Sequence, residues 1–231
     1  MLFYGYYLDP LYMYLVLPAI VLCIFAQIKV KSTFSKYSKS YCFLSGCEAA
    51  KQVLEANGVY DVGIERVSGN LTDHYDPKAN VIRLSHTVYD ARTVSAVGVA
   101  AHEAGHAVQY AKNYSPIKWR TAIYPICRFG SSLSFPLLFI GLFLGLPFLM
   151  NVGIVFFALA LAFQLITLPV EFNASRRAIE TIRTNNLLPD EYQVKRAKKV
   201  LSAAALTYIA AFLVSLAQLL RLLALTNRRR R

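Results

Sequence analysis

Two histidines and a glutamate stand close together at His102, Glu103 and His106, within the sequence AAHEAGHAVQY. Their spacing is the H-E-x-x-H pattern. Residues four apart on a helix project from one face, so both imidazoles can bind a single metal ion. Zinc lowers the pKa of a bound water toward neutrality, and Glu103 can then act as the general base toward that water. The pattern therefore predicts metal-assisted hydrolysis of a peptide bond.

The residues around these three side chains are almost all small or apolar. We expect a helix that begins near Asp90 or Thr93 and ends near Lys112. A helix that is apolar on most sides is buried, and buried polar side chains are costly unless they have partners. Structural histidines in this helix would each need several hydrogen-bond partners, so the metal interpretation is favoured.

A catalytic zinc needs a third protein ligand and one open coordination position. No histidine follows His106, which excludes the longer HExxHxxGxxH arrangement. His74, His86 and a later carboxylate are the candidates. Glu171 is the strongest, because it is the first charge after a long uncharged stretch and follows Pro169, which can bend a helix.

Four apolar segments give the chain its composition of 56% hydrophobic and 16% charged residues, too apolar for an ordinary soluble domain. The segments are Leu11–Ile28, Ile126–Met150, Val152–Val170 and Leu201–Leu220. As a helix the first spans roughly 27 Å, close to the hydrocarbon thickness of a bilayer. We predict a mainly α integral membrane protein with about four transmembrane helices.

The predicted crossings place His102 and Glu171 on one side of the membrane. His102 lies between the first and second segments, and Glu171 follows the third, so two crossings separate them. Lysines and arginines cluster on this side, after the first segment and within residues 171–200. The positive-inside rule therefore predicts a site that faces the cytoplasm. The arginines Arg228–Arg231 are discordant and leave open whether the last segment spans fully. As an alternative to a role as zinc ligand, Glu171 could cap a helix or pair with Arg176 or Arg177.

The net charge of +12 has the same origin. Basic residues flank the apolar segments instead of covering a folded face, which favours contact with anionic lipids. We therefore expect membrane lipids as partners, and no nucleic acid.

The stretch between the first two segments has the patterning of a soluble domain. A capping box at Ser45–Glu48 predicts a helix that ends near Asn57. Val62–Val67 and Val81–Ser85 are predicted strands, and Ser68–Asn80, rich in turn formers, is a predicted loop.

The chain resembles the YugP-like family of bacterial membrane-bound neutral zinc metallopeptidases. The resemblance covers nearly the whole chain and rests on LTDHYDP (Leu71–Pro77), AAHEAGHAVQ (Ala100–Gln109) and LPVEFNASRRA (Leu168–Ala178). The chain is also similar, more distantly, to the membrane gluzincins, which include the CAAX-prenyl endopeptidases and the heat-shock membrane protease. Those proteins carry a glutamate ligand in an E-x-x-x-D pattern after a membrane hairpin. The resemblance implies Glu171 as third ligand of one catalytic Zn²⁺. Where their aspartate would stand, this chain has Ser175.

These arguments divide the chain into five predicted segments. They are a transmembrane anchor (1–28), a small α+β zincin-like catalytic domain with the HExxH helix (29–125), a transmembrane hairpin (126–170), a cytoplasmic segment with the third zinc ligand (171–200), and a C-terminal transmembrane helix with a basic tail (201–231). Val81–Ser85 is expected at the sheet edge, where an extended substrate could pair with it. For His74 and Asp76 a turn is favoured over an ion site. Candidate oxyanion donors are Tyr75, His86, Tyr89 and Arg176.

The predicted function is a membrane-embedded zinc endopeptidase of the bacterial cell membrane. It would cut membrane-associated or misfolded polypeptides, with His102, His106 and Glu171 on zinc and Glu103 as general base. The alternative is a non-catalytic scaffold or adaptor that retains a structural zinc. Glu103 argues against it, because a structural site needs no base. A third and weaker interpretation is a lipid- or RNA-binding protein that acts through its basic ends. The sequence does not define an oligomeric state.

Overall fold

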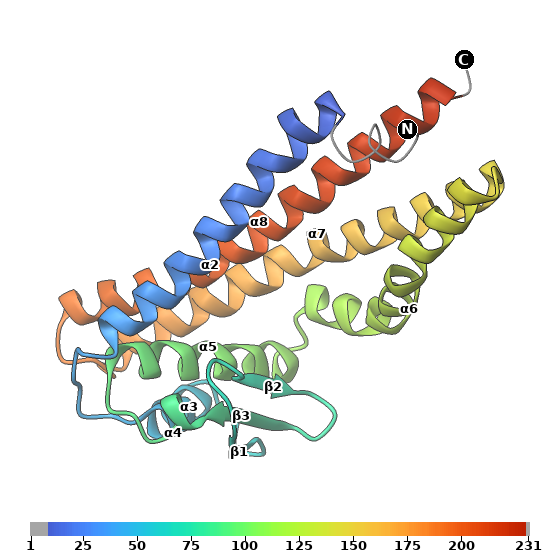
Figure 1. Ribbon diagram of the computed structural model, residues 1–231. Coiled ribbons are helices and arrows are strands. Elements are labelled where there is room, and N and C mark those ends of the chain that lie inside the picture. Colours follow the sequence, from blue (N-terminus) through green and yellow to red (C-terminus); the bar gives the residue numbers. More distant parts are fainter. Residues whose placement is uncertain (1–8, 230–231) are drawn as a thin grey trace. The chain divides into compact units, whose positions relative to one another are not determined.

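The computed structural model describes residues 9–229, so residues 1–8 of the predicted anchor and the end of the basic tail lie outside it (Figure 1). The chain divides into two compact units. Within the described residues, the helical unit contains 9–27, 119–168 and 207–229, and the sheet-containing unit contains Ile28–Lys118 and Pro169–Leu206. Each unit is described by itself below.

Four long helices confirm the prediction of a mainly helical membrane protein. The first is the π-helix η1 (Tyr12–Val16) continued by α2 (Leu17–Tyr37), and the others are α6 (Ser115–Phe143), α7 (Pro147–Thr184) and α8 (Glu191–Arg229). All four are long and apolar enough to cross a membrane. Many of their large apolar side chains are exposed, as lipid contact requires, including Val21 at 57%, Phe129 at 66% and Leu165 at 56%.

The second apolar segment is not one helix. Helix α6 ends at Phe143 and α7 begins at Pro147, so the predicted Ile126–Met150 span contains the turn between them. Gly145 has φ +65° there, a conformation in which glycine meets no steric penalty from a Cβ. Apolar residues continue through the turn, so hydropathy alone did not reveal it.

Helix α7 is longer than a bilayer is thick. Its 38 residues extend to about 57 Å, against a hydrocarbon core of about 30 Å. Pro169 lies inside this helix, which continues to Thr184. The polar end of α7, which carries Glu171, therefore extends beyond the span as a helix.

The sheet-containing unit builds a small sheet beside three helices, α3 (Gly46–Ala56), α4 (His86–Tyr89) and α5 (Val94–Ala111) (Figure 1). Its strands are β1 (Gly63–Val67), β2 (His74–Asp76) and β3 (Val81–Ser85), in the order β1-β3-β2. β1 pairs with β3 in parallel, and β2 pairs with β3 antiparallel.

Two expectations about this sheet are wrong. β3 is the central strand, not the edge, because both of its sides are paired. β2 lies inside the predicted loop Ser68–Asn80, since the turn at Asp76 returns the chain against β3. The Asp76 carboxylate accepts from the backbone N–H of Lys78 at 2.9 Å and forms an ion pair with Arg83 at 2.6 Å. The turn therefore follows Asp76, at residues 77–80, and not before Pro77 as expected, because His74 and Asp76 belong to β2.

The core of this unit forms around α5, as its composition predicts. Val97, Ala100, Ala101, Ala104 and Val108 are each 0% exposed. Thr93 caps the helix by accepting a hydrogen bond from the Ala96 N–H at 3.3 Å. The small residues allow neighbouring elements to approach the α5 backbone closely.

Candidate metal centre

The site lies where the HExxH helix α5 meets the polar end of α7. Gly105 makes the approach possible, because a Cβ at this position would lie 2.8 Å from the carbonyl oxygen of Ala174. That distance is shorter than van der Waals contact, so only glycine fits without movement of a backbone. The contact places α7 beside the turn of α5 that carries both histidines.

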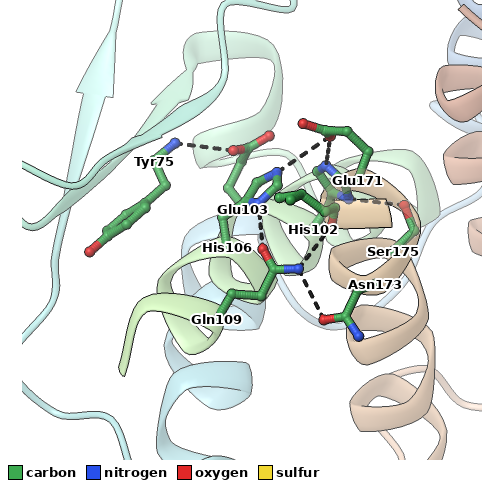
Figure 2. A network of polar contacts seen from close by, with 9 residues as sticks. Tyr75, His102, Glu103, His106, Gln109, Glu171, Asn173 and Ser175 are labelled. Atoms are coloured by element: carbon green, nitrogen blue, oxygen red, sulfur yellow. Dashed lines mark hydrogen bonds and ion pairs between the residues drawn. The ribbon is translucent and has the colours of Figure 1, made fainter. Parts of the chain in front are cut away.

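Three side chains converge at this contact (Figure 2). The Nε2 atoms of His102 and His106 lie 3.3 and 3.4 Å from Oε2 of Glu171. In residues 9–229 these three form the group of histidine, cysteine or carboxylate side chains that could hold a metal ion, with ligand atoms within 4.8 Å of one another. Glu171 is 2% exposed and His106 is 8% exposed, so the donors are removed from bulk water.

These distances suit a tetrahedral zinc ion. With bonds of 2.0–2.1 Å, neighbouring ligand atoms of a tetrahedron lie about 3.3–3.4 Å apart. A direct charge-assisted N–H···O⁻ hydrogen bond would be shorter, about 2.7–2.9 Å. The residues present therefore fit zinc in donor type and in both histidine–glutamate distances.

The hydrogen bonds of Gln109 determine which nitrogen of His106 faces Glu171. Nε2 of Gln109 donates to the Val170 carbonyl at 2.8 Å and to Oδ1 of Asn173 at 3.0 Å. Its Oε1, 3.0 Å from Nδ1 of His106, can only accept. Nδ1 of His106 must therefore carry a proton, which leaves the lone pair of a neutral imidazole on Nε2. That lone pair points at a carboxylate, an arrangement that a cation between them stabilises.

His102 has a corresponding partner in Ser175. Oγ of Ser175 lies 3.1 Å from Nδ1 of His102, on the side of the ring away from Glu171. A hydroxyl can accept a hydrogen bond from Nδ1–H, as the aspartate of the E-x-x-x-D pattern would, although it carries no negative charge. Ser175 therefore occupies the orienting position one turn after Glu171.

Glu103 lies beside the three converging side chains without joining them (Figure 2). Its Oε2 accepts a hydrogen bond from the backbone N–H of Tyr75 at 3.1 Å. The pKa of Glu103 is raised to about 7, mainly by burial; His102 opposes the shift, and the negative charges of Glu171 and Asp73 add to it. A carboxyl group with this pKa can accept and return a proton near neutral pH.

Asp73, just before β2, fixes the strand whose Tyr75 N–H contacts Glu103. Asp73 accepts hydrogen bonds from the backbone N–H of Ser85 at 2.7 Å and from its hydroxyl at 3.0 Å. Burial raises the pKa of Asp73. These contacts connect the start of β2 to the end of β3, and they give the LTDHYDP sequence a structural role next to the site.

The side chains of the other candidate metal ligands and oxyanion donors do not join the site. His74 is exposed, with Nδ1 2.8 Å from the Thr72 carbonyl oxygen, and His86 is exposed at the start of α4. The Tyr75 ring points away from Glu103 in Figure 2, and its hydroxyl donates to Oδ1 of Asn80 at 2.7 Å. The Tyr89 ring stacks against Arg66. Arg176 is exposed.

Gln109 and Asn173 were missed at the level of sequence. Gln109 was visible as a further polar residue on a buried helix, three positions after His106. Its partner Asn173 lies on another helix, and residue spacing gives no indication of that pairing. Asn173 also accepts from Nε of Arg177 at 2.8 Å, which gives this arginine a partner other than Glu171.

The three converging side chains and the buried carboxyl group of Glu103 suit a metallopeptidase, and comparison with known proteins identifies the family. Residues 12–227 match the family described as "Putative neutral zinc metallopeptidase", and the chain belongs to this family. It is 49% identical over 214 residues to the "Putative membrane protease YugP" of Bacillus subtilis (strain 168), covering 91% of this chain and 94% of that protein. No solved structure gives a significant match. The resemblance inferred from sequence is confirmed, and the chain is a membrane protein of a zinc metallopeptidase family.

Proposed function

We propose that the chain is a membrane-embedded zinc endopeptidase in which His102, His106 and Glu171 hold one Zn²⁺ and Glu103 is the general base. The observation that carries this proposal is the convergence of two Nε2 atoms on one buried carboxylate oxygen, at 3.3 and 3.4 Å. A structural zinc would need no base beside it, whereas Glu103 lies buried there with a pKa of about 7.

A bound zinc ion would supply a Lewis acid that polarises a peptide carbonyl and lowers the pKa of water. The protein's own groups do the rest. Gln109 and Ser175 hold the imidazole rings so that both Nε2 lone pairs face the same point. Glu103 takes the proton of the attacking water and passes it to the leaving amine. The Tyr75 N–H fixes the orientation of that carboxylate.

Cytoplasmic orientation and substrate class belong to the same proposal. The site belongs to the polar stretch of α7 that follows its apolar segment, which supports polypeptides at or near the membrane as substrates. Lysines and arginines after the first span and within residues 171–200 support a cytoplasmic site.

Zinc content and peptide cleavage by the purified full-length protein test the site together. Wild type should contain about one zinc per chain and cleave casein. Glu103→Gln should retain its zinc and lose at least about a hundredfold in cleavage rate, because only the base is removed. Glu171→Gln should lose most of its zinc, because a neutral amide replaces the anionic ligand.

Each outcome separates the proposals. Cleavage that survives Glu103→Gln contradicts the mechanism, and full zinc in Glu171→Gln points to another third ligand. A zinc-loaded wild type that cleaves none of a panel of unfolded and membrane-associated polypeptides supports the scaffold alternative.

A further inference from the structure

A cavity of about 300 Å³ lies where the start of α8 packs beside the end of α2, within the sheet-containing unit. Two tyrosines and four basic residues line most of it: Tyr37, Tyr192, Lys195, Arg196, Lys198 and Lys199. No residue that lines it, in the part of the chain the structure describes, is acidic. Its volume is at the lower end of the range for small-molecule sites, about 300–1,000 Å³.

The arginine of this basic cavity is held in place. Cζ of Arg196 lies 4.0 Å from the centre of the Tyr192 ring and 5.9 Å from that of Tyr37. Its Nη1 donates to Oγ of Ser40 at 2.5 Å, on the segment that follows α2. A guanidinium held by a ring and a hydroxyl loses little further freedom on binding a ligand, and its planar donors match a phosphate group.

The nearby acidic residues are engaged in other contacts. Glu191 pairs with Arg183 through two contacts of 2.8 and 3.0 Å. The Asp190 carboxylate accepts from the backbone N–H of Gln193 at 2.7 Å. Glu191 also attracts Lys195 and Lys198, but neither carboxylate lines the cavity, so the lining carries net positive charge.

The position of the cavity along the chain indicates which anion it receives. Lys198 and Lys199 come directly before the apolar segment Leu201–Leu220, and Ser202, on the first turn of that segment, also lines the cavity. Basic residues at this position meet the anionic headgroups of a bilayer, and tyrosine is enriched at the same depth. Tyr192 is 63% exposed, and Tyr41, whose carbonyl oxygen accepts from Gln193 at 3.4 Å, is 80% exposed.

We propose that the basic cavity binds the phosphate of an anionic phospholipid headgroup. The guanidinium of Arg196 donates hydrogen bonds to the phosphate oxygens, and the three lysines of the lining add positive charge. The acyl chains then continue along the apolar surface of α8. This site is independent of the metal centre and of the peptidase proposal.

Native mass spectrometry of the full-length protein in detergent tests the assignment with three probes. These are a short-chain phosphatidylglycerol, a phosphatidylcholine with the same chains, and inorganic phosphate. Wild type should bind phosphatidylglycerol at least about tenfold more tightly than the other two. Lys195→Gln/Lys199→Gln should weaken phosphatidylglycerol binding by about tenfold or more, since it removes two of the four positive charges that line the cavity.

Lys29→Gln/Lys31→Gln is the matched control, because it removes two positive charges that adjoin the apolar segment of α2. It should bind phosphatidylglycerol as wild type does. Equal weakening in both double variants would overturn the proposal in favour of general charge attraction. Inorganic phosphate bound as tightly as the lipid would overturn the lipid assignment, and so would wild type without preference for phosphatidylglycerol. A thermal midpoint measured for each variant separates lost binding from lost folding, and the wild-type comparison of probes holds whichever variant unfolds.

Discussion

At the scale of single residues, the chemistry of the site depends on the groups behind the histidines. Both rings have a partner at Nδ1, Ser175 for His102 and Gln109 for His106. Such partners orient metal-binding imidazoles and raise their basicity, and their loss typically lowers metal affinity by 10–100-fold. In this protein one partner is a hydroxyl and the other an amide, and both are uncharged.

Ser175 is therefore expected to contribute to zinc affinity without touching the metal. Ser175→Ala should lower zinc affinity about tenfold in a competition titration with a chromophoric chelator. Ser175→Asp should bind at least as tightly as wild type, because a carboxylate accepts the same proton with a full charge. Ser131→Ala is the control, because the Ser131 hydroxyl donates to the Arg128 carbonyl of its own helix. Unchanged affinity in Ser175→Ala would remove Ser175 from the site.

At the scale of elements, the site exists because two helices approach at a glycine. Gly105 lies against the Ala174 backbone, and a Cβ there would come within 2.8 Å of the carbonyl oxygen. Gly98, two turns earlier on α5, is different, because its Cβ would meet Ala197 at an ordinary 3.6 Å. We therefore expect opposite effects on stability from alanine at these two positions of α5.

Gly105→Ala should destabilise the protein by about 1–3 kcal/mol, the usual cost of overpacking, and should lower zinc affinity because α7 carries Glu171. Gly98→Ala should be neutral or stabilising by up to about 1 kcal/mol, since alanine has the higher helix propensity. Thermal unfolding and zinc titration of both variants test this. A Gly105→Ala protein with wild-type stability would show that the contact is looser than the structure indicates.

At the scale of the whole molecule, the crossings of the membrane decide which side the site faces. In a background without the four native cysteines, Lys51→Cys on α3 reports the site's side, and Leu146→Cys reports the turn between α6 and α7. Both positions are exposed, at 71% for the Lys51 side chain and 43% for Leu146. An impermeant maleimide added to intact cells should label Leu146→Cys only. Labelling of Lys51→Cys instead would place the site outside the cell.

A buried ion pair within the helical unit connects the two ends of the chain. Nη2 of Arg221 on α8 lies 2.7 Å from Oδ2 of Asp9, and the two residues are 5% and 7% exposed. Asp9 also accepts from the backbone N–H of Tyr12 at 2.9 Å. Charges buried in an apolar environment are stable only as a pair.

Asp9→Asn should therefore destabilise the protein by about 3 kcal/mol, because it removes the negative charge opposite the buried Arg221. Asp9→Leu/Arg221→Leu should recover most of that loss, since no charge remains. Thermal midpoints in detergent compare the two. If the double variant is as unstable as Asp9→Asn, the cost does not come from the loss of the charge opposite Arg221.

Much of the fold could be predicted because its signals are local. Hydropathy over about 20 residues identified four membrane helices, and the capping box at Ser45–Glu48 identified α3, whose two reciprocal hydrogen bonds are present at 3.2 and 2.7 Å. The sheet was less predictable. β2 is three residues long, and its pairing with β3 depends on a turn and on Asp73. Strand order is a long-range property that no residue pattern within one strand contains.

The sequence by itself determined the chemistry of this protein: two histidines and a glutamate at helical spacing, and a later glutamate separated from them by two apolar segments. Only the tertiary structure decided that Glu171 lies 3.3–3.4 Å from both histidines, and that Gln109 and Ser175 orient them. The physical reason is that periodicity within one helix fixes which residues share a face. Contacts between α5 and α7 depend on a close approach at Gly105, and a close approach is a property of two packed helices.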